Sequence, residues 1–149
     1  MVLSLGDMSS LEDLYQSKIL EFARMARDIN LLTDPNVSFT SKNPVCGDEV
    51  TIDLIINKDN IISHYGHKVR GCALCEASTG LLSKNVIGLN FKNSFILKKN
   101  LSFWLNEKLD KFTFSEIENF SPVKKFKNRY KCVLLSFDAL QGACEKHIN

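Results

Sequence analysis

An alternating pattern in the first half of the chain limits its fold more than any other feature. Residues 50–56 (VTIDLII) alternate in character and are rich in β-branched side chains, and residues 61–69 resume as a second such stretch after Lys58-Asp59-Asn60. Two β-prone stretches joined by a short polar turn predict a hairpin. Phe39 is a candidate for a further strand beside this pair. We therefore expect a small antiparallel sheet whose apolar face needs covering by other elements.

A first amphipathic helix is expected ahead of this sheet. It should begin near Ser10, which suits an N-cap and has Asp13 three residues on, close to the positive helix end. The residues Asp34-Pro35-Asn36 then break the chain. The apolar stripe of this helix comprises Leu11, Tyr15, Ile19, Phe22, Ala26 and Ile29.

Further helices are expected after the hairpin. Residues 73–86 have a helical pattern, and residues 91–120 should hold one or two shorter helices, the second capped by Ser115 with Glu118. The last helix should open at Cys132. Its stripe comprises Val133, Phe137, Leu140, Cys144 and Ile148. The prediction is a single α+β domain over residues 1–149, with a small antiparallel sheet covered by helices.

Composition narrows the class of protein. The 149 residues carry a net charge of only +2, which gives no reason to expect a nucleic-acid or anionic-membrane partner. No apolar run approaches the ~20 residues that cross a bilayer. The first six residues lack the pattern of a secretory signal, so we expect a cytoplasmic protein. In a reducing compartment, its five cysteines are more often metal ligands, nucleophiles or core residues than disulfide partners.

The segment Cys46-Gly47-Asp48 could hold a metal ion. Gly47 permits a tight turn, so that a thiolate and a carboxylate two residues apart can converge on one point. Mixed sulfur and oxygen ligation suits zinc and also ferrous iron. The alternative is an ordinary turn with a buried cysteine and a capping aspartate, and the three residues taken alone favour it.

A second candidate is Cys72-Ala73-Leu74-Cys75, where the second strand gives way to a helix. A thiol at a helix N-terminus is stabilised as a thiolate, and Cys75 lies one turn further on the same face. C-x-x-C is a zinc half-site and also a redox motif, but the βαβ pattern expected around the redox motif is absent. Cys75 is equally well explained as a small core residue.

The other two cysteines and two of the histidines are expected to have different roles. Cys132 follows a basic run, residues 124–131, and we expect Arg129 and Lys131 to lower its pKa. Cys144 lies on the apolar stripe of the last helix and should pack in the core. His64 and His67 are three apart on a strand and should face opposite sides, so they are not expected to share a metal.

Three motifs, in the same order along the chain, resemble the signatures of a known family. Residues 43–48 (NPVCGD), 71–78 (GCALCEAS) and 129–135 (RYKCVLL) are similar to the signatures of the iron–sulfur scaffold proteins IscU, SufU and the NifU N-terminal domain. The likeness covers nearly the whole chain. It is closer to the SufU type, because 60 positions separate Cys72 from Cys132 and because Lys131 stands where IscU-type proteins have a histidine.

The resemblance implies a function and a set of site residues. Cys46, Asp48, Cys72 and Cys132 would bind zinc or a nascent [2Fe–2S] cluster. From the chemistry of the donors, and not from the resemblance, we expect Asp48 to be the ligand that dissociates, because a carboxylate is less covalent than a thiolate, and Cys75 could then hold the cluster as an additional ligand. A cysteine desulfurase would deliver persulfide sulfur, with Cys46 the preferred acceptor and Cys132 the alternative. The cluster would pass to recipient apo-proteins or carriers.

Two departures and one alternative accompany the resemblance. The N-P-R-N-like segment common after the family's first helix is not recognisable, and Cys75 is not a shared ligand of its best-known members. The alternative function is a zinc-bound sulfurtransferase that stimulates the desulfurase, and only then would the protein be an enzyme. A purely structural zinc module is disfavoured, because such sites usually use a closed set of Cys and His ligands.

Overall fold

The computed structural model describes residues 16–149, and in it the first helix, α1, spans Ser17–Arg27. Four residues assigned to the start of this helix lie outside the described residues: Ser10, Leu11, Asp13 and Tyr15. The rest of the stripe is buried as predicted, except that the helix ends before Ile29. In its last turn the Ala26 carbonyl accepts a hydrogen bond from His67 Nε2 (2.7 Å), which ties the helix end to the sheet.

The sheet has three antiparallel strands in the order β1-β2-β3: Val37–Asn43, Asp48–Ile56 and Ile62–Arg70. Phe39 lies opposite Ile52, which in turn lies opposite His67, so the predicted hairpin and the further strand at Phe39 are confirmed. The middle strand begins at Asp48, earlier than the alternating pattern indicated. Asp48 is therefore the first residue of the central strand rather than part of the loop.

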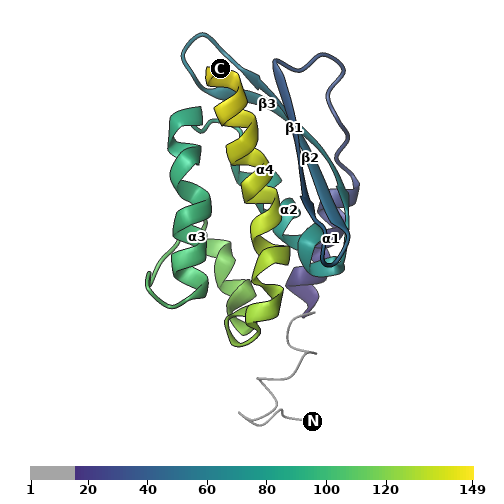
Figure 1. The fold of residues 1–149 in the computed structure, drawn as a ribbon, viewed down its shortest axis with the longest axis vertical. Helices are drawn as coiled ribbons and strands as arrows, with labels where there is room; N and C mark the ends of the chain where they lie inside the picture. The colour runs from purple at the N-terminus through teal and green to yellow at the C-terminus, as the bar shows by residue number, and fades with distance from the viewer. Residues whose placement is uncertain (1–15) are drawn as a thin grey trace.

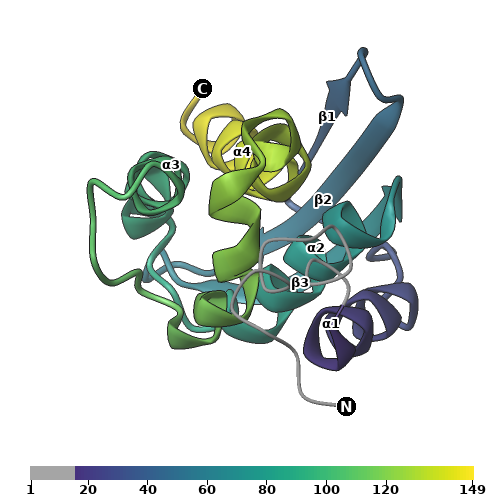
Figure 2. The same ribbon diagram turned by 90° about the horizontal axis from the view of Figure 1, so that it is seen from below.

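Helices cover one side of this sheet (Figure 1), which confirms the α+β prediction. Helix α2 (Ala73–Asn85) packs against β3 and α1, and α4 (Tyr130–Ile148) crosses β1 and β2. Seen from below, α3 flanks α4 on the side away from the sheet (Figure 2). Two close approaches need glycine: a side chain at Gly80 would run into the Phe22 carbonyl, and one at Gly142 into the Phe39 ring.

The connection from α2 to α4 contains a short α-helix, α3 (Leu97–Leu105), and three 3₁₀ segments. These are η3 (Phe91–Ile96), η4 (Ser115–Lys125) and η5 (Lys127–Arg129). The first short helix is confirmed, but the predicted cap by Ser115 and Glu118 is wrong. Phe114 holds the N-cap position without a side-chain hydrogen bond, and Pro122, which has no N–H, lies inside η4.

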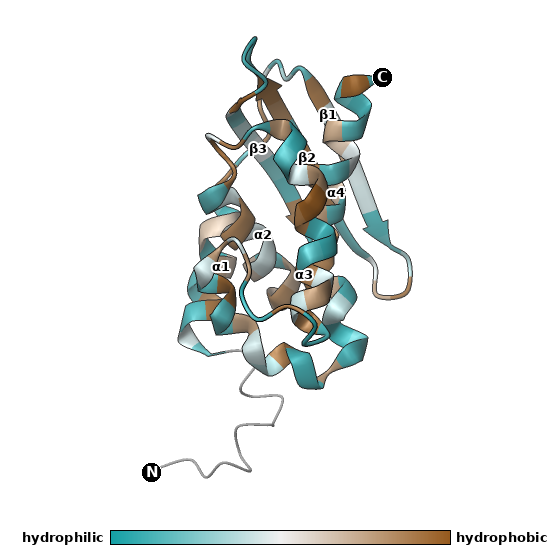
Figure 3. Cartoon of the chain, turned by 90° about the vertical axis from the view of Figure 1, so that its left-hand side faces the viewer, coloured by the Kyte–Doolittle hydropathy of each residue, from teal (hydrophilic) through white to brown (hydrophobic). Residues whose placement is uncertain are grey.

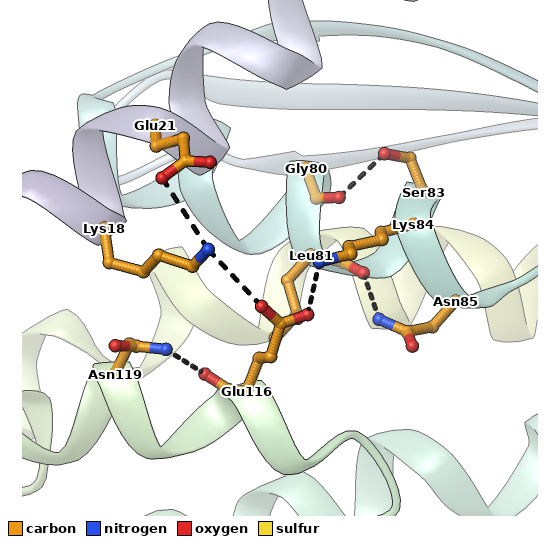
Figure 4. Close-up of polar contacts among 9 residues, drawn as sticks. All are labelled: Lys18, Glu21, Gly80, Leu81, Ser83, Lys84, Asn85, Glu116 and Asn119. Carbon is orange, nitrogen blue, oxygen red and sulfur yellow. Dashed lines mark hydrogen bonds and ion pairs between the residues drawn. The ribbon is translucent and has the colours of Figure 1, made fainter.

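An ionic contact fixes η4 against the first two helices. Glu116 pairs with Lys84 at 2.8 Å and with Lys18 at 3.5 Å, so one carboxylate joins α1, α2 and η4 (Figure 4).

Around α1, α3 and α4 hydrophilic and hydrophobic residues alternate, as in amphipathic helices (Figure 3). Among residues 16–149, no helix is both long enough and apolar enough to cross a bilayer.

Candidate metal and sulfur centre

The loop between β1 and β2 presents Cys46. Gly47 has a positive φ of 79° and its N–H donates to the Asn43 carbonyl (2.8 Å), so the turn relies on glycine as expected. The side chain of Asn43 also accepts the Val45 N–H (3.2 Å), which stiffens the loop from within. Cys46 is exposed, and Val45 beside it is 84% exposed. The thiol therefore sits on a projecting, well-defined turn.

Asp48 follows at the first position of β2 and is only 3% exposed. Its Oδ1 accepts the backbone N–H of Cys72 at 3.2 Å, and its Oδ2 lies 3.9 Å from Cys72 Sγ. A Cβ atom at Gly71 would fall 2.6 Å from Asp48 Oδ1. A side chain at this position would therefore displace the buried Asp48 carboxylate.

Cys72 is the N-cap residue of α2, as its predicted position at a helix start implied. Its Sγ accepts the backbone N–H of Cys75 at 3.5 Å. Cys132 lies in the first turn of α4, two residues past the helix start, and is buried. The thiols of both residues therefore lie near positive helix ends.

These groups converge on one place. Ligand atoms of Cys46, Asp48 and Cys132 lie within 4.8 Å of one another, and Cys72 adjoins them through Asp48. The four side chains come from three parts of the chain that are far apart in the sequence: the β1–β2 turn with the start of β2, the start of α2 and the start of α4. The structure thus brings together the four residues predicted to form the site.

The two helix-start thiols have opposite pKa shifts. A hydrogen bond from Cys132 lowers the pKa of Cys72 to about 6, and the backbone N–H groups at the start of α2 add to this effect. The pKa of Cys132 is raised, first by that same hydrogen bond and then by burial. The prediction that Arg129 and Lys131 lower the pKa of Cys132 is wrong. The hydrogen bond with Cys72, burial and the charges of Cys72, Asp48 and Cys46 all raise that pKa instead.

The other candidates lie outside the converging group. The thiol of Cys75 is fully buried, and burial raises its pKa. Cys144 packs in the core as predicted, with its Sγ 2.9 Å from Ser94 Oγ. His64 is exposed while His67 is buried against Ala26 and Tyr65, so the two rings do face opposite sides.

Comparison with known proteins identifies the family of this chain. The family model described as "NifU-like N terminal domain" matches residues 14–146. The chain belongs to the NifU-like N-terminal domain family. The resemblance predicted from the three motifs is confirmed.

Relatives in this family carry two kinds of name. The chain is 26% identical to the iron–sulfur cluster assembly scaffold protein IscU of Thermotoga maritima over 89% of this chain and 94% of that protein. It is also 26% identical to the zinc-dependent sulfurtransferase SufU of Bacillus subtilis, over 93% of this chain and 94% of that protein. Equal identities do not separate the two types, so the closer likeness to SufU stays a prediction.

Solved structures of family members share the fold. The NifU-like N-terminal protein of Brucella abortus superposes with a TM-score of 0.82 at 31% identity, covering 93% of this chain and 96% of that one. The SUF-system scaffold protein of Fervidobacterium islandicum gives 0.82 at 26% identity, covering 91% and 99%. The sheet and its covering helices are therefore those of the NifU-like family.

A cleft of about 460 Å³ opens beside the converging thiols, and sequence patterns alone did not place it there. Cys46 and Cys132 line it together with Lys127, Arg129 and Lys131. The basic run was visible in the sequence, but only the fold of η5 onto the start of α4 turns it toward Cys46. An exposed thiol therefore faces a cationic hollow.

Proposed function

We propose that this protein is an iron–sulfur cluster assembly scaffold. It accepts sulfur from a cysteine desulfurase, combines it with iron as a [2Fe–2S] cluster, and passes the cluster to recipient apo-proteins or carriers. The observation that carries the proposal is the convergence of Cys46, Asp48, Cys72 and Cys132 from three separate parts of the chain. Membership of a family whose relatives include named scaffolds supports it.

The donor set fits such a cargo. Three thiols and one carboxylate suit iron and zinc, and Fe–S clusters are held by cysteine thiolates. Among the described residues, the backbone N–H of Cys72 donates to Asp48 Oδ1, and Asp48 Oδ2 lies 3.9 Å from Cys72 Sγ. A buried carboxylate beside a thiolate is costly unless a cation compensates both. The arrangement therefore favours a bound metal.

The function is tested by cluster assembly on the intact protein under anaerobic conditions. With ferrous iron, L-cysteine and a cysteine desulfurase, the wild-type protein should develop [2Fe–2S] absorption and then activate an apo-ferredoxin. Cys132→Ser should do neither, whereas the matched variant of a core cysteine, Cys144→Ser, should behave as wild type. Absence of a transferable cluster on the wild-type protein contradicts the proposal.

Asp48 is the ligand that we propose to dissociate during transfer. A carboxylate binds these metals less covalently than a thiolate does, so its departure would open a position for incoming sulfur or for the recipient's ligand. Asp48→Ala should then hold a cluster longer and transfer it more slowly. Cluster loss as fast as in wild type would show that Asp48 does not control release.

We propose Cys46 as the sulfur acceptor, with Cys132 as the alternative. Cys46 is exposed on its loop and faces the cleft, whereas Cys132 is only 4% exposed. Mass spectrometry after desulfurase turnover should find persulfide on Cys132→Ser but little on Cys46→Ser. The reverse pattern assigns the role to Cys132.

A zinc-bound sulfurtransferase is the second candidate, favoured by the SufU relative with that printed name. The same four residues would then hold zinc. Metal analysis of protein purified with and without oxygen separates the two functions. Iron and acid-labile sulfide that appear only without oxygen support the scaffold. Zinc that persists in both, with desulfurase stimulation and no cluster transfer, supports the sulfurtransferase.

A further inference from the structure

Cys75 has a position that the scaffold function does not use. It is the third residue of α2, and its backbone N–H donates to the Sγ of Cys72, the N-cap residue, at 3.5 Å. This contact, from the backbone N–H of the third helical residue to the side chain at the N-cap, is one half of a capping box. The pair is thus a vicinal dithiol at a helix start, the geometry on which C-x-x-C redox chemistry depends.

The two thiols face different surroundings. Cys72 is partly exposed and its Sγ adjoins Asp48, on the side of the converging ligands. Cys75 is fully buried and lies behind Cys72, toward the core. An extra sulfur atom on Cys72 would therefore extend toward the site, leaving the inner sulfur next to Cys75.

We propose that Cys75 is a resolving thiol that releases sulfide from a persulfide on Cys72. This inference rests on the proposed function, which supplies persulfide sulfur through the desulfurase and the exposed Cys46. Cys75 Sγ attacks Cys72 Sγ, forming the Cys72–Cys75 disulfide and breaking the bond to the outer sulfur. That sulfur leaves as sulfide and takes up the proton of the Cys75 thiol.

The electrons balance within the pair. The outer sulfur is reduced from the sulfane to the sulfide level, and the two cysteine sulfurs are oxidised together to a disulfide. The two thiols therefore supply both electrons needed for one sulfide. A small-molecule or protein dithiol must then reduce the disulfide before Cys72 can serve again as a ligand.

The geometry allows closure with a small movement. Cys72 Sγ already lies 3.5 Å from the backbone nitrogen of Cys75, and a disulfide needs the two Cβ atoms about 4 Å apart. Cys72 is outside the helix proper, at an extended φ and ψ of −69° and 164°, so it can shift without unwinding α2. Attack from the buried side needs no access from solvent.

Cys144 provides the matched control. It is also fully buried, but its neighbour is the hydroxyl of Ser94 rather than a second thiol. A purely structural role for Cys75 predicts that removing either buried thiol has the same effect on sulfide release. The resolving role predicts that only Cys75 matters.

The test uses metal-free full-length protein under anaerobic conditions, loaded with inorganic polysulfide and desalted. Wild type and Cys144→Ser should release roughly one sulfide per chain without added reductant, and peptide mapping should find a Cys72–Cys75 disulfide. Cys75→Ser and Cys75→Ala should keep their persulfide and release sulfide at least tenfold more slowly until dithiothreitol is added.

Several results would overturn the inference. Release from both Cys75 variants at the wild-type rate would do so, as would a wild-type disulfide that joins any other pair. The second readout needs no variant, so it holds even if a Cys75 substitution weakens folding. A wild-type protein that takes up no persulfide from polysulfide would also overturn the inference, whereas the proposed function fails only if desulfurase-driven cluster assembly fails. Normal uptake with unchanged release overturns this inference alone.

Discussion

The two turns at the ends of β2 differ in where their polar groups find partners. In the turn between β2 and β3, Asn57 Oδ1 accepts the N–H groups of Asp59 and Ile61 at 2.9 and 3.1 Å, and its carbonyl accepts that of Asn60 at 3.0 Å. In the turn between β1 and β2, the backbone closes in a similar way, but Cys46 and Asp48 direct their side chains toward α2 and α4.

The difference between the two turns shows which structural features a scaffold site requires. The β2–β3 turn is complete by itself, so it specifies local structure and nothing more. The β1–β2 turn directs a thiol and a buried carboxylate away from its own backbone, and groups from the two helix starts lie beside them. Chemistry is thus expected at the turn whose side chains meet other segments, and the predictions below change either the residues of that site or the β2–β3 turn.

The largest effect should come from removing a converging thiol. Cys72→Ser or Cys132→Ser should weaken zinc binding by roughly 100-fold or more, because a hydroxyl is a far poorer ligand than a thiolate. Competition with a chromophoric chelator measures the affinity, with Cys144→Ser as control. Wild-type affinity in Cys132→Ser would remove that residue from the site.

A smaller effect is expected from Gly71→Ala, which touches the site only through Asp48. The added Cβ would meet the Asp48 carboxylate and displace it, lowering zinc affinity by about 10-fold, as for other residues that orient a ligand. In the Asp48→Ala background the same substitution should add almost nothing. Equal losses in both backgrounds would mean that Gly71 acts elsewhere.

Charge changes in the cationic cleft should have a smaller effect on function than the changes to the ligands and to Gly71. We propose that the desulfurase docks at this cleft, because its sulfur must reach Cys46, and that it meets the lysines with acidic groups. Lys127→Glu combined with Lys131→Glu should then weaken the association by about 10-fold at low salt, and the loss should shrink as salt screens the charges. Lys58→Glu, in the β2–β3 turn, carries the same charge change away from the cleft. Surface plasmon resonance at two salt concentrations would compare them, and equal losses from both would argue against docking at the cleft.

The smallest effect on the site should come from the β2–β3 turn itself. Asn57→Ala removes the acceptor of two backbone N–H groups, which should lower the free energy of unfolding by about 1–2 kcal/mol. Zinc affinity should stay at the wild-type value, because the lost contacts are local. Chemical denaturation measures the change in stability, and the chelator assay measures the zinc affinity. A clear loss of zinc affinity would contradict the claim that the β2–β3 turn affects only local structure.

Much of this arrangement could be predicted from local patterns. Alternation and helical stripes placed the strands and the main helices, and the glycine in Cys46-Gly47-Asp48 indicated the turn. Cys72 was expected at a helix start because a strand ends at Gly71. These features depend on residues close together in the sequence.

What could not be predicted depends on contacts between distant segments. The pKa of Cys132 rises because Cys72 faces it, whereas the sequence shows only the lysine and arginine beside it. The need for Gly71 follows from the Asp48 carboxylate lying over it, which sheet and helix packing decide. The second short helix is a 3₁₀ segment without the expected cap, and it is held by Glu116 ion pairs with Lys18 of α1 and Lys84 of α2, which lie far away in the sequence.

X-ray absorption at the zinc edge of the metal-loaded protein tests the central claim most directly, because it counts ligands by element. Our account predicts three sulfur ligands at about 2.3 Å and one oxygen at about 2.0–2.2 Å, with the oxygen lost or replaced in Asp48→Ala. Four sulfur ligands in the wild-type protein, which would place Cys75 in the site and Asp48 outside it, would contradict the account, as would fewer than three.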